Sequence, residues 1–157
     1  MNLEQIKKTV SGLTNDKFVT LKIDISLFDD GSKKGYKSYN KYIKENVDKK
    51  YGVYIFFNPI KQTAIYIGMA GKLNKNSQPK QTLDERLTAH RYQNKVTNEN
   101  INTNKWVFEI MKEHEIEELF IYVFYVNPKI PSAYIEALLL YNFYKIHEII
   151  PIENSEF

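Results

Sequence analysis

The stretch GVYIFF (residues 52–57), NPIKQT (58–63) and AIYIG (64–68) decides the fold expected for this chain. Two runs rich in β-branched and aromatic residues flank a polar turn with a proline, which predicts a β-hairpin. Side chains alternate between the two faces of a strand. Pairing that keeps the aliphatic residues Val53, Ile55, Phe57, Ile65 and Ile67 together puts Tyr54 and Tyr66 on the other face. Gly52 and Gly68 then leave open backbone beside two neighbouring phenols. Taken alone, the hairpin favours a plainer interpretation, a tyrosine face that is half exposed.

Further landmarks follow the hairpin in a fixed order along the chain. Thr82 and Glu85 form a capping box that predicts a helix, on which Arg86 and His90 are four residues apart and share a face. Glu136 lies in the apolar helix predicted over 133–147, where a carboxylate needs a partner or a cation unless it begins an exposed face. The stretch Pro-Ile-Glu-Asn follows this helix at 151–154.

The order Gly-Val-Tyr, Tyr-Ile-Gly, Arg-x-x-x-His, Glu and Pro-x-x-Asn resembles the GIY-YIG nuclease superfamily over about residues 51 to 154. The fold class expected is α/β (α+β type). It has a small, mostly antiparallel sheet, built from the hairpin and a central strand at 119–126, flanked by helices. Residues 1–50 are predicted to be an N-terminal extension packed on the core, and residues 51–157 a GIY-YIG nuclease-like catalytic domain.

Composition limits the other classes of protein. With 157 residues and 43% hydrophobic residues the chain can bury a core as one domain. It has no Cys, which excludes disulfides and thiolate zinc sites. No segment approaches the ~20 apolar residues of a membrane span, and no signal peptide is evident. A soluble cytoplasmic protein without a membrane partner is expected.

Positive charge gathers on both sides of the hairpin in sequence. Residues 31–50 hold seven Lys against two acidic residues, and residues 71–105 hold seven Lys or Arg against three acidic residues. Residues 106–157, in contrast, hold three basic against nine acidic residues. This distribution favours a polyanionic partner near the hairpin, although solvated basic loops and a helix docked by its tyrosines explain it equally well. The candidates for nucleic-acid binding are Lys33, Lys34, Lys37, Lys41, Lys72 and Arg91.

The resemblance implies roles for individual residues. Glu136 is the metal ligand and holds one Mg²⁺ or Mn²⁺, Arg86 contacts the scissile phosphate, and Tyr54 is the general base. A free phenol titrates near ~10, so Tyr54 needs a lowered pKa, with Arg86 and Lys72 as the cations that would lower it. Tyr66 and His90 orient water or phosphate, with His90 as an alternative base. Asn154 braces the site, and Asn142 is a weaker candidate for that role.

The function predicted is a divalent-metal-dependent endonuclease that hydrolyses DNA phosphodiester bonds. A stand-alone restriction-type or phage/mobile-element enzyme is favoured. A repair or homing nuclease of the family, and a catalytically silent DNA- or RNA-binding module, are the alternatives. One chain has one site and a duplex has two antiparallel strands, so double-stranded DNA and a homodimer on it are expected.

Overall fold

The structure is a computed structural model that describes residues 1–29, 33–71, 81–93 and 98–154. It describes only the backbone of Asp16, Lys17, Lys33, His90, Tyr92 and Gln93. The helices and strands in chain order are α1 (Leu3–Val10), β1 (Thr14–Asp24), the 3-10 helix η1 (Ile25–Phe28), α2 (Lys33–Asn46), β2 (Gly52–Asn58), β3 (Thr63–Ala70), α3 (Leu83–Thr88), β4 (His90–Gln93), β5 (Asn100–Asn102), α4 (Thr103–Glu113), β6 (Glu118–Val126) and α5 (Ser132–His147).

The main sheet is antiparallel and has the strand order β1-β6-β2-β3. Strand β6 is central: Val123 pairs with Val19 of β1 on one side and with Tyr54 of β2 on the other. Its apolar sequence suits this position, because a strand covered on both faces needs no alternation. The predicted α+β class and the central strand at 119–126 are confirmed, with β6 beginning at Glu118.

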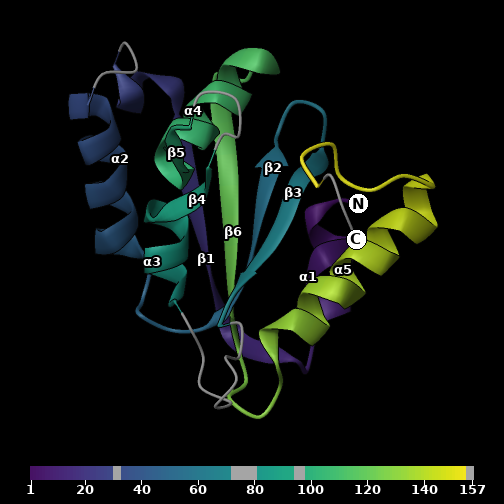
Figure 1. The fold of residues 1–157 in the computed structure, drawn as a ribbon. Coiled ribbons are helices and arrows are strands. Elements are labelled where there is room, and N and C mark those ends of the chain that lie inside the picture. Colours follow the sequence, from purple (N-terminus) through teal and green to yellow (C-terminus); the bar gives the residue numbers. More distant parts are fainter. Residues whose placement is uncertain (30–32, 72–80, 94–97, 155–157) are drawn as a thin grey trace.

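Helices cover both faces of the sheet (Figure 1). On one face, α1 and α5 contribute Ile6 and Ile135 to a core with Val53, Ile55 and Ile67. On the other face, α2, α3 and α4 pack over Tyr54 and Phe56 and contribute the buried residues Tyr39, Leu83, Leu87, Trp106 and Val107. On the predicted tyrosine face, Tyr54 is therefore fully buried, whereas Tyr66 is half-buried.

The hairpin of β2 and β3 pairs Ile55 with Ile67 and Phe56 with Tyr66. A bulge follows Phe56, where the partner of the next residue, Phe57, is Ala64. A bulge inserts one residue and reverses the alternation beyond it. Ile65 consequently packs with the tyrosine face, and its predicted place with the aliphatic face is wrong.

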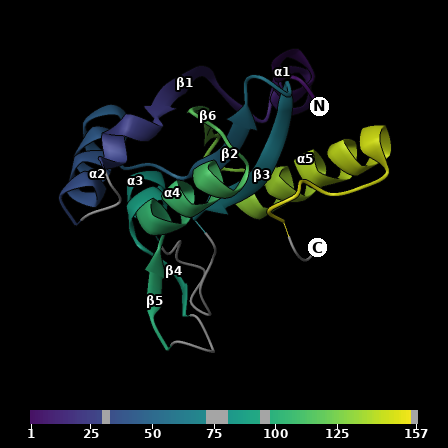
Figure 2. The same cartoon turned by 90° about the horizontal axis from the view of Figure 1, so that it is seen from above.

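Helix α3 ends before His90, so it is too short to carry both Arg86 and His90. It ends at Thr88, Ala89 is extended, and His90 begins β4. The prediction that Arg86 and His90 share a helix face is therefore wrong. Strands β4 and β5 form a separate two-stranded sheet, which projects beyond the helices in Figure 2.

Residues 1–50 contribute to the same layers as the rest of the chain. Strand β1 pairs with β6, α1 lies beside α5, and α2 lies beside α3 and α4. The amino group of Met1 contacts the imidazole of His147 at the end of α5. Among the helices that the structure describes, none is both long and apolar enough to cross a membrane.

Candidate active site at the edge of strand β3

Two tyrosines of the hairpin lie at the centre of the candidate site. Tyr54 on β2 is fully buried, Tyr66 on β3 is half-buried, and their ring centroids are 6.0 Å apart. Tyr54 lies opposite Gly68, where a Cβ atom would stand 2.8 Å from the phenolic oxygen. The backbone at Gly68 is therefore covered by the two rings, and the expectation of open backbone there is wrong.

Helix α3 holds Arg86 above these phenols. The predicted capping box of Thr82 and Glu85 is present at its start. At its end the buried hydroxyl of Thr103 donates to the carbonyl oxygens of Arg86 at 3.0 Å and Ala89 at 3.2 Å. Both ends of a helix of fewer than two turns are thus fixed, which sets the direction of the Arg86 side chain.

The half-buried guanidinium of Arg86 interacts electrostatically with both phenols. Burial lowers the pKa of Arg86, but the phenols of Tyr54 and Tyr66 outweigh burial and raise it above its ordinary value. The carboxylate of Glu136, in the second turn of α5, adds to this rise. Side chains from β2, β3, α3 and α5 therefore meet within electrostatic reach of one guanidinium.

The pKa of Tyr54 is raised, whereas the expected role as general base requires a lowered pKa. Burial raises the pKa of Tyr54 well above its ordinary value, and Tyr66 raises it further. Arg86 and Arg91 lower it by less. The phenolic oxygen makes no hydrogen bond of normal geometry to the residues that the structure describes, although Arg86 lies beside it. Because its pKa is raised, Tyr54 is a neutral hydroxyl at physiological pH.

Arg91 differs from an ordinary surface cation. Its guanidinium lies 3.4 Å from the centroid of Trp106 and 4.3 Å from that of Tyr66. Such stacking is worth about 2 kcal/mol where water is excluded. The Nη1 atom is buried and has no hydrogen-bond partner in the described parts of the chain.

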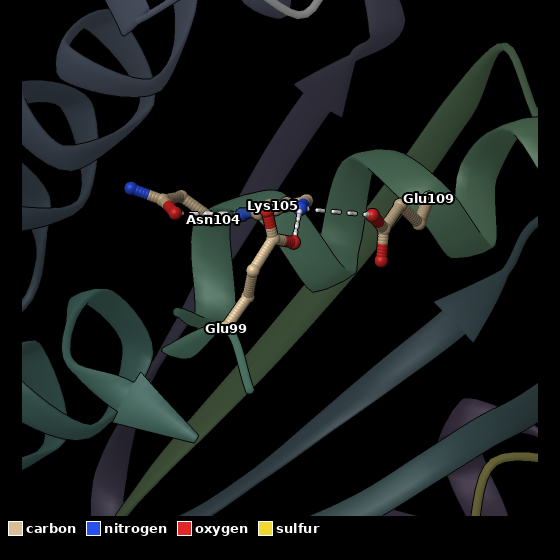
Figure 3. Close-up of polar contacts among 4 residues, drawn as sticks. All are labelled: Glu99, Asn104, Lys105 and Glu109. Atoms are coloured by element: carbon tan, nitrogen blue, oxygen red, sulfur yellow. Dashed lines mark hydrogen bonds and ion pairs between the residues drawn. The ribbon is translucent and has the colours of Figure 1, made fainter. Parts of the chain in front are cut away.

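Polar contacts fix the start of α4, which carries Trp106. The Lys105 ammonium lies 3.3 Å from Glu99 and 3.8 Å from Glu109 (Figure 3). The Asn104 side chain donates to Asn40 on α2 at 3.1 Å. These contacts tie α4 to α2 on one side and to Glu99, the residue before β5, on the other.

Asn154 lies against the free edge of β3. Its side chain accepts from the Ile67 amide at 2.9 Å and donates to the Ile67 carbonyl at 2.8 Å. The backbone N–H of the preceding Glu153 donates a hydrogen bond to the Ile65 carbonyl, and the Glu153 carboxylate lies 2.7 Å from the imidazole of His114. Asn142 instead makes one long contact, 3.4 Å, to Thr9 on the opposite side of α5 from the tyrosines.

Several predicted residues lie away from this centre or outside the described atoms. Lys34, Lys37 and Lys41 are exposed on α2, and Lys41 pairs with Glu45 at 3.8 Å. Lys72 lies outside the described residues. The side chains of Lys33 and His90 also lie outside the described atoms, so only their backbone positions in α2 and β4 are known.

Sequence reasoning missed Tyr39 and Trp106. Tyr39 stands in a helix with other tyrosines, and Trp106 follows a helix start, so each has only the pattern of a core residue. Their roles depend on which residues they meet across the fold, and no local spacing encodes that.

Within the described ranges, no group of three or more His, Asp or Glu side chains gathers as a metal cluster. Comparison of the chain with protein-family models, with curated proteins and with solved structures found no match.

Proposed function

We propose that this protein is a divalent-metal-dependent endonuclease of the GIY-YIG type, which hydrolyses DNA phosphodiester bonds. The observation that carries the proposal is the meeting of Tyr54, Tyr66 and Glu136 around the guanidinium of Arg86. These residues come from four elements: the two adjacent strands of the hairpin, β2 and β3, and the helices α3 and α5. They are also the residues to which the sequence resemblance assigns the chemistry.

The donor set fits Mg²⁺ or Mn²⁺. These cations prefer hard oxygen ligands, and Mg²⁺ commonly uses one or two carboxylates together with waters and substrate phosphates. Glu136 is half-buried and supplies such a carboxylate. A cation bound there would neutralise charge on a phosphate oxygen and acidify a water molecule. Glu136 is the residue proposed to hold it.

The remaining residues bind and orient the phosphate. Arg86 is cationic at all relevant pH values and stabilises the charge of the pentacovalent phosphorus. Tyr54 donates a hydrogen bond from a neutral hydroxyl, and Tyr66 orients water or phosphate. Because burial raises the pKa of Tyr54, the proton of the attacking water passes more readily to an imidazole. His90, the alternative base, is proposed for this step.

The proposed substrate is double-stranded DNA, approached from the side of the basic helix α2. Lys34, Lys37 and Lys41 are exposed there and can neutralise phosphates without reading sequence. One site per chain and two antiparallel strands favour a homodimer on DNA. The stand-alone restriction-type or phage/mobile-element enzyme that the sequence favours is also the enzyme proposed here, in preference to a repair or homing nuclease.

A catalytically silent nucleic-acid-binding module is the second candidate. The raised pKa of Tyr54 favours it, because a general base must be able to lose its proton. Such a module would bind DNA through the same cations without cutting it.

The substitution Glu136→Gln separates these two functions. It removes the charge at almost constant volume, so metal-dependent cleavage of supercoiled plasmid should fall at least a hundredfold while duplex binding stays within about twofold. Glu148→Gln, at the far end of α5, is the matched control and should cleave like the wild type. Wild-type protein that binds DNA but never cleaves it with Mg²⁺ or Mn²⁺ would support the silent module instead.

A further inference from the structure

Among the described residues, the buried side-chain atoms that lack a hydrogen-bond partner are the hydroxyls of Tyr39 and Tyr54 and the Nη1 of Arg91. Buried polar groups in proteins are nearly always paired, so an unpaired group needs a physical explanation. These atoms come from α2, β2 and β4 and belong to one neighbourhood.

Their proximity follows from packing and electrostatics. Tyr39 stacks on Phe28 with centroids 5.2 Å apart and shares a core with Tyr54. Burial raises the pKa of Tyr39, the Tyr54 phenol raises it further, and Arg91 lowers it. The three groups therefore lie within electrostatic reach of one another.

A contact between α2 and α4 involves residues next to Tyr39 on one helix and close to Trp106, the stacking partner of Arg91, on the other. Asn40, which follows Tyr39, accepts from Asn104 at 3.1 Å. Trp106, two residues beyond Asn104, is the ring on which Arg91 stacks. This hydrogen bond therefore links the helix that carries Tyr39 to the helix that carries the stacking partner of Arg91.

The chemistry of the unpaired atoms selects their ligand. Guanidinium nitrogens donate only, and neutral phenols donate readily. Two phenols and one guanidinium thus present donors and a positive charge. The ligand that satisfies them is an anion with several acceptor oxygens. Arg and Tyr hydroxyls are common partners of phosphate oxygens.

We propose that Tyr39 and Arg91, with Tyr54, form a binding site for a phosphate oxygen, supplied in part by a helix outside the segment that resembles the nuclease family. Resting on the proposed function, the inference names a substrate contact beyond Arg86. The phosphate belongs either to the nucleic-acid backbone or to a free phosphate ion, because both present the same oxygens.

The test is Tyr39→Phe in the full chain, which removes one oxygen from a fully buried ring. Binding is measured without divalent cations, so that no cleavage occurs. One arm follows the rise in Tm with inorganic phosphate, and the other measures affinity for a short DNA duplex. Loss of a charge-assisted hydrogen-bond partner should weaken binding about tenfold in at least one arm.

Stability gives a second readout that a structural role would not produce. A hydroxyl without a partner contributes nothing to folding, so Tyr39→Phe should keep or raise the Tm without phosphate. Tyr36→Phe is the matched control: it stands one turn earlier on α2, and its phenol faces Lys105 and Glu109. This control should bind both probes like the wild type. Arg91→Lys keeps the charge, removes Nη1 and should reproduce the weaker binding.

The outcomes divide clearly. Weaker binding in the duplex arm assigns the site to a nucleic-acid phosphate, and weaker binding only with inorganic phosphate assigns it to a free ion. Unchanged binding in both arms for Tyr39→Phe overturns the proposal and leaves buried water as the partner of these atoms. Plasmid cleavage by the wild type is scored separately. A loss of binding in a protein that never cleaves DNA supports this site and refutes only the nuclease.

Discussion

Gly68 shows how one residue without a side chain shapes the candidate site. A Cβ atom there would lie 2.6 Å from the ring of Tyr66 and 2.8 Å from the hydroxyl of Tyr54. At Gly52 the same atom would lie 2.1 Å from the carbonyl oxygen of Phe124 on β6. The first contact is with side chains that can turn, whereas the second is with the backbone of the central strand.

Gly68→Ala should therefore affect the site more than the fold. We expect a loss of about 1–3 kcal/mol in the free energy of unfolding, as for overpacked cores. Cleavage should fall sharply because Tyr54 is displaced. Gly52→Ala should cost more stability, since β2 must separate from β6. Urea unfolding and plasmid cleavage measure both effects. Wild-type stability and activity in Gly68→Ala would contradict this description of the site.

At this scale the sequence predicted the pairing of the tyrosines but not their environment. The alternation over 53–57 correctly puts Tyr54 and Tyr66 on one face. It does not show that α2, α3 and α4 cover that face. The position of Ile65 was wrong because a bulge changes the alternation and leaves no mark in an apolar run.

At the scale of elements, the segment 151–154 acts as a short extra partner for β3. Asn154 pairs with both polar groups of the Ile67 backbone. An edge strand presents unpaired amides and carbonyls, and covering them is a common protection. The same contact fixes the strand that carries Tyr66.

Asn154→Ala should lower the free energy of unfolding by about 1–3 kcal/mol, because two backbone groups of Ile67 lose their partner. Asn142→Ala, which removes one contact at 3.4 Å, should change it by less than about 0.5 kcal/mol. Thermal or urea unfolding of the two variants provides the comparison. Equal effects would show that the segment 151–154 does not hold β3.

The start of α3 and both ends of α5 followed closely from sequence, whereas the end of α3 did not. The capping box at Thr82 is present, and α5 begins at Ser132, one residue before the predicted 133. The end of α3 was missed because nothing after Thr88 is a helix breaker. The Thr103 hydroxyl, from a distant element, takes the Arg86 carbonyl that a longer helix would have used.

For the whole molecule, the two fully buried phenols have a consequence for alkaline stability. Burial raises the pKa of both Tyr39 and Tyr54, so both stay protonated in the folded chain while they ionise in the unfolded chain. The unfolded state then binds fewer protons. The stabilisation is complete below pH ~10 and is lost as pH rises above it.

Each such tyrosine should lower the free energy of unfolding by about 1.4 kcal/mol per pH unit above pH ~10. Urea unfolding between pH 9 and 11 measures the slope. Tyr39→Phe should make the decline shallower by one tyrosine, whereas Tyr134→Phe, an exposed residue, should leave it unchanged. A slope in Tyr39→Phe identical to that of the wild type would show that Tyr39 ionises in the folded protein.

The meeting of Tyr54, Arg86 and Glu136 was predictable only through the family resemblance. Spacing along the chain shows that each residue lies on a strand or helix. It does not show that α5 and α3 approach the same strand from opposite faces of the sheet. Arg91 illustrates the limit, since its two aromatic partners come from β3 and α4.

The position of β6 also determines when the sheet can assemble. Its two neighbours, β1 and β2, are made first, yet neither pairs with the other. During synthesis they wait for residues 118–126, with only the hairpin of β2 and β3 able to close locally. Pairing between strands that lie far apart in the sequence slows folding, because the chain loses entropy in closing the long loop before the paired strands stabilise it. The main sheet therefore cannot be completed until residues 118–126 are available, and the apolar strands β1 and β2 depend on that one segment.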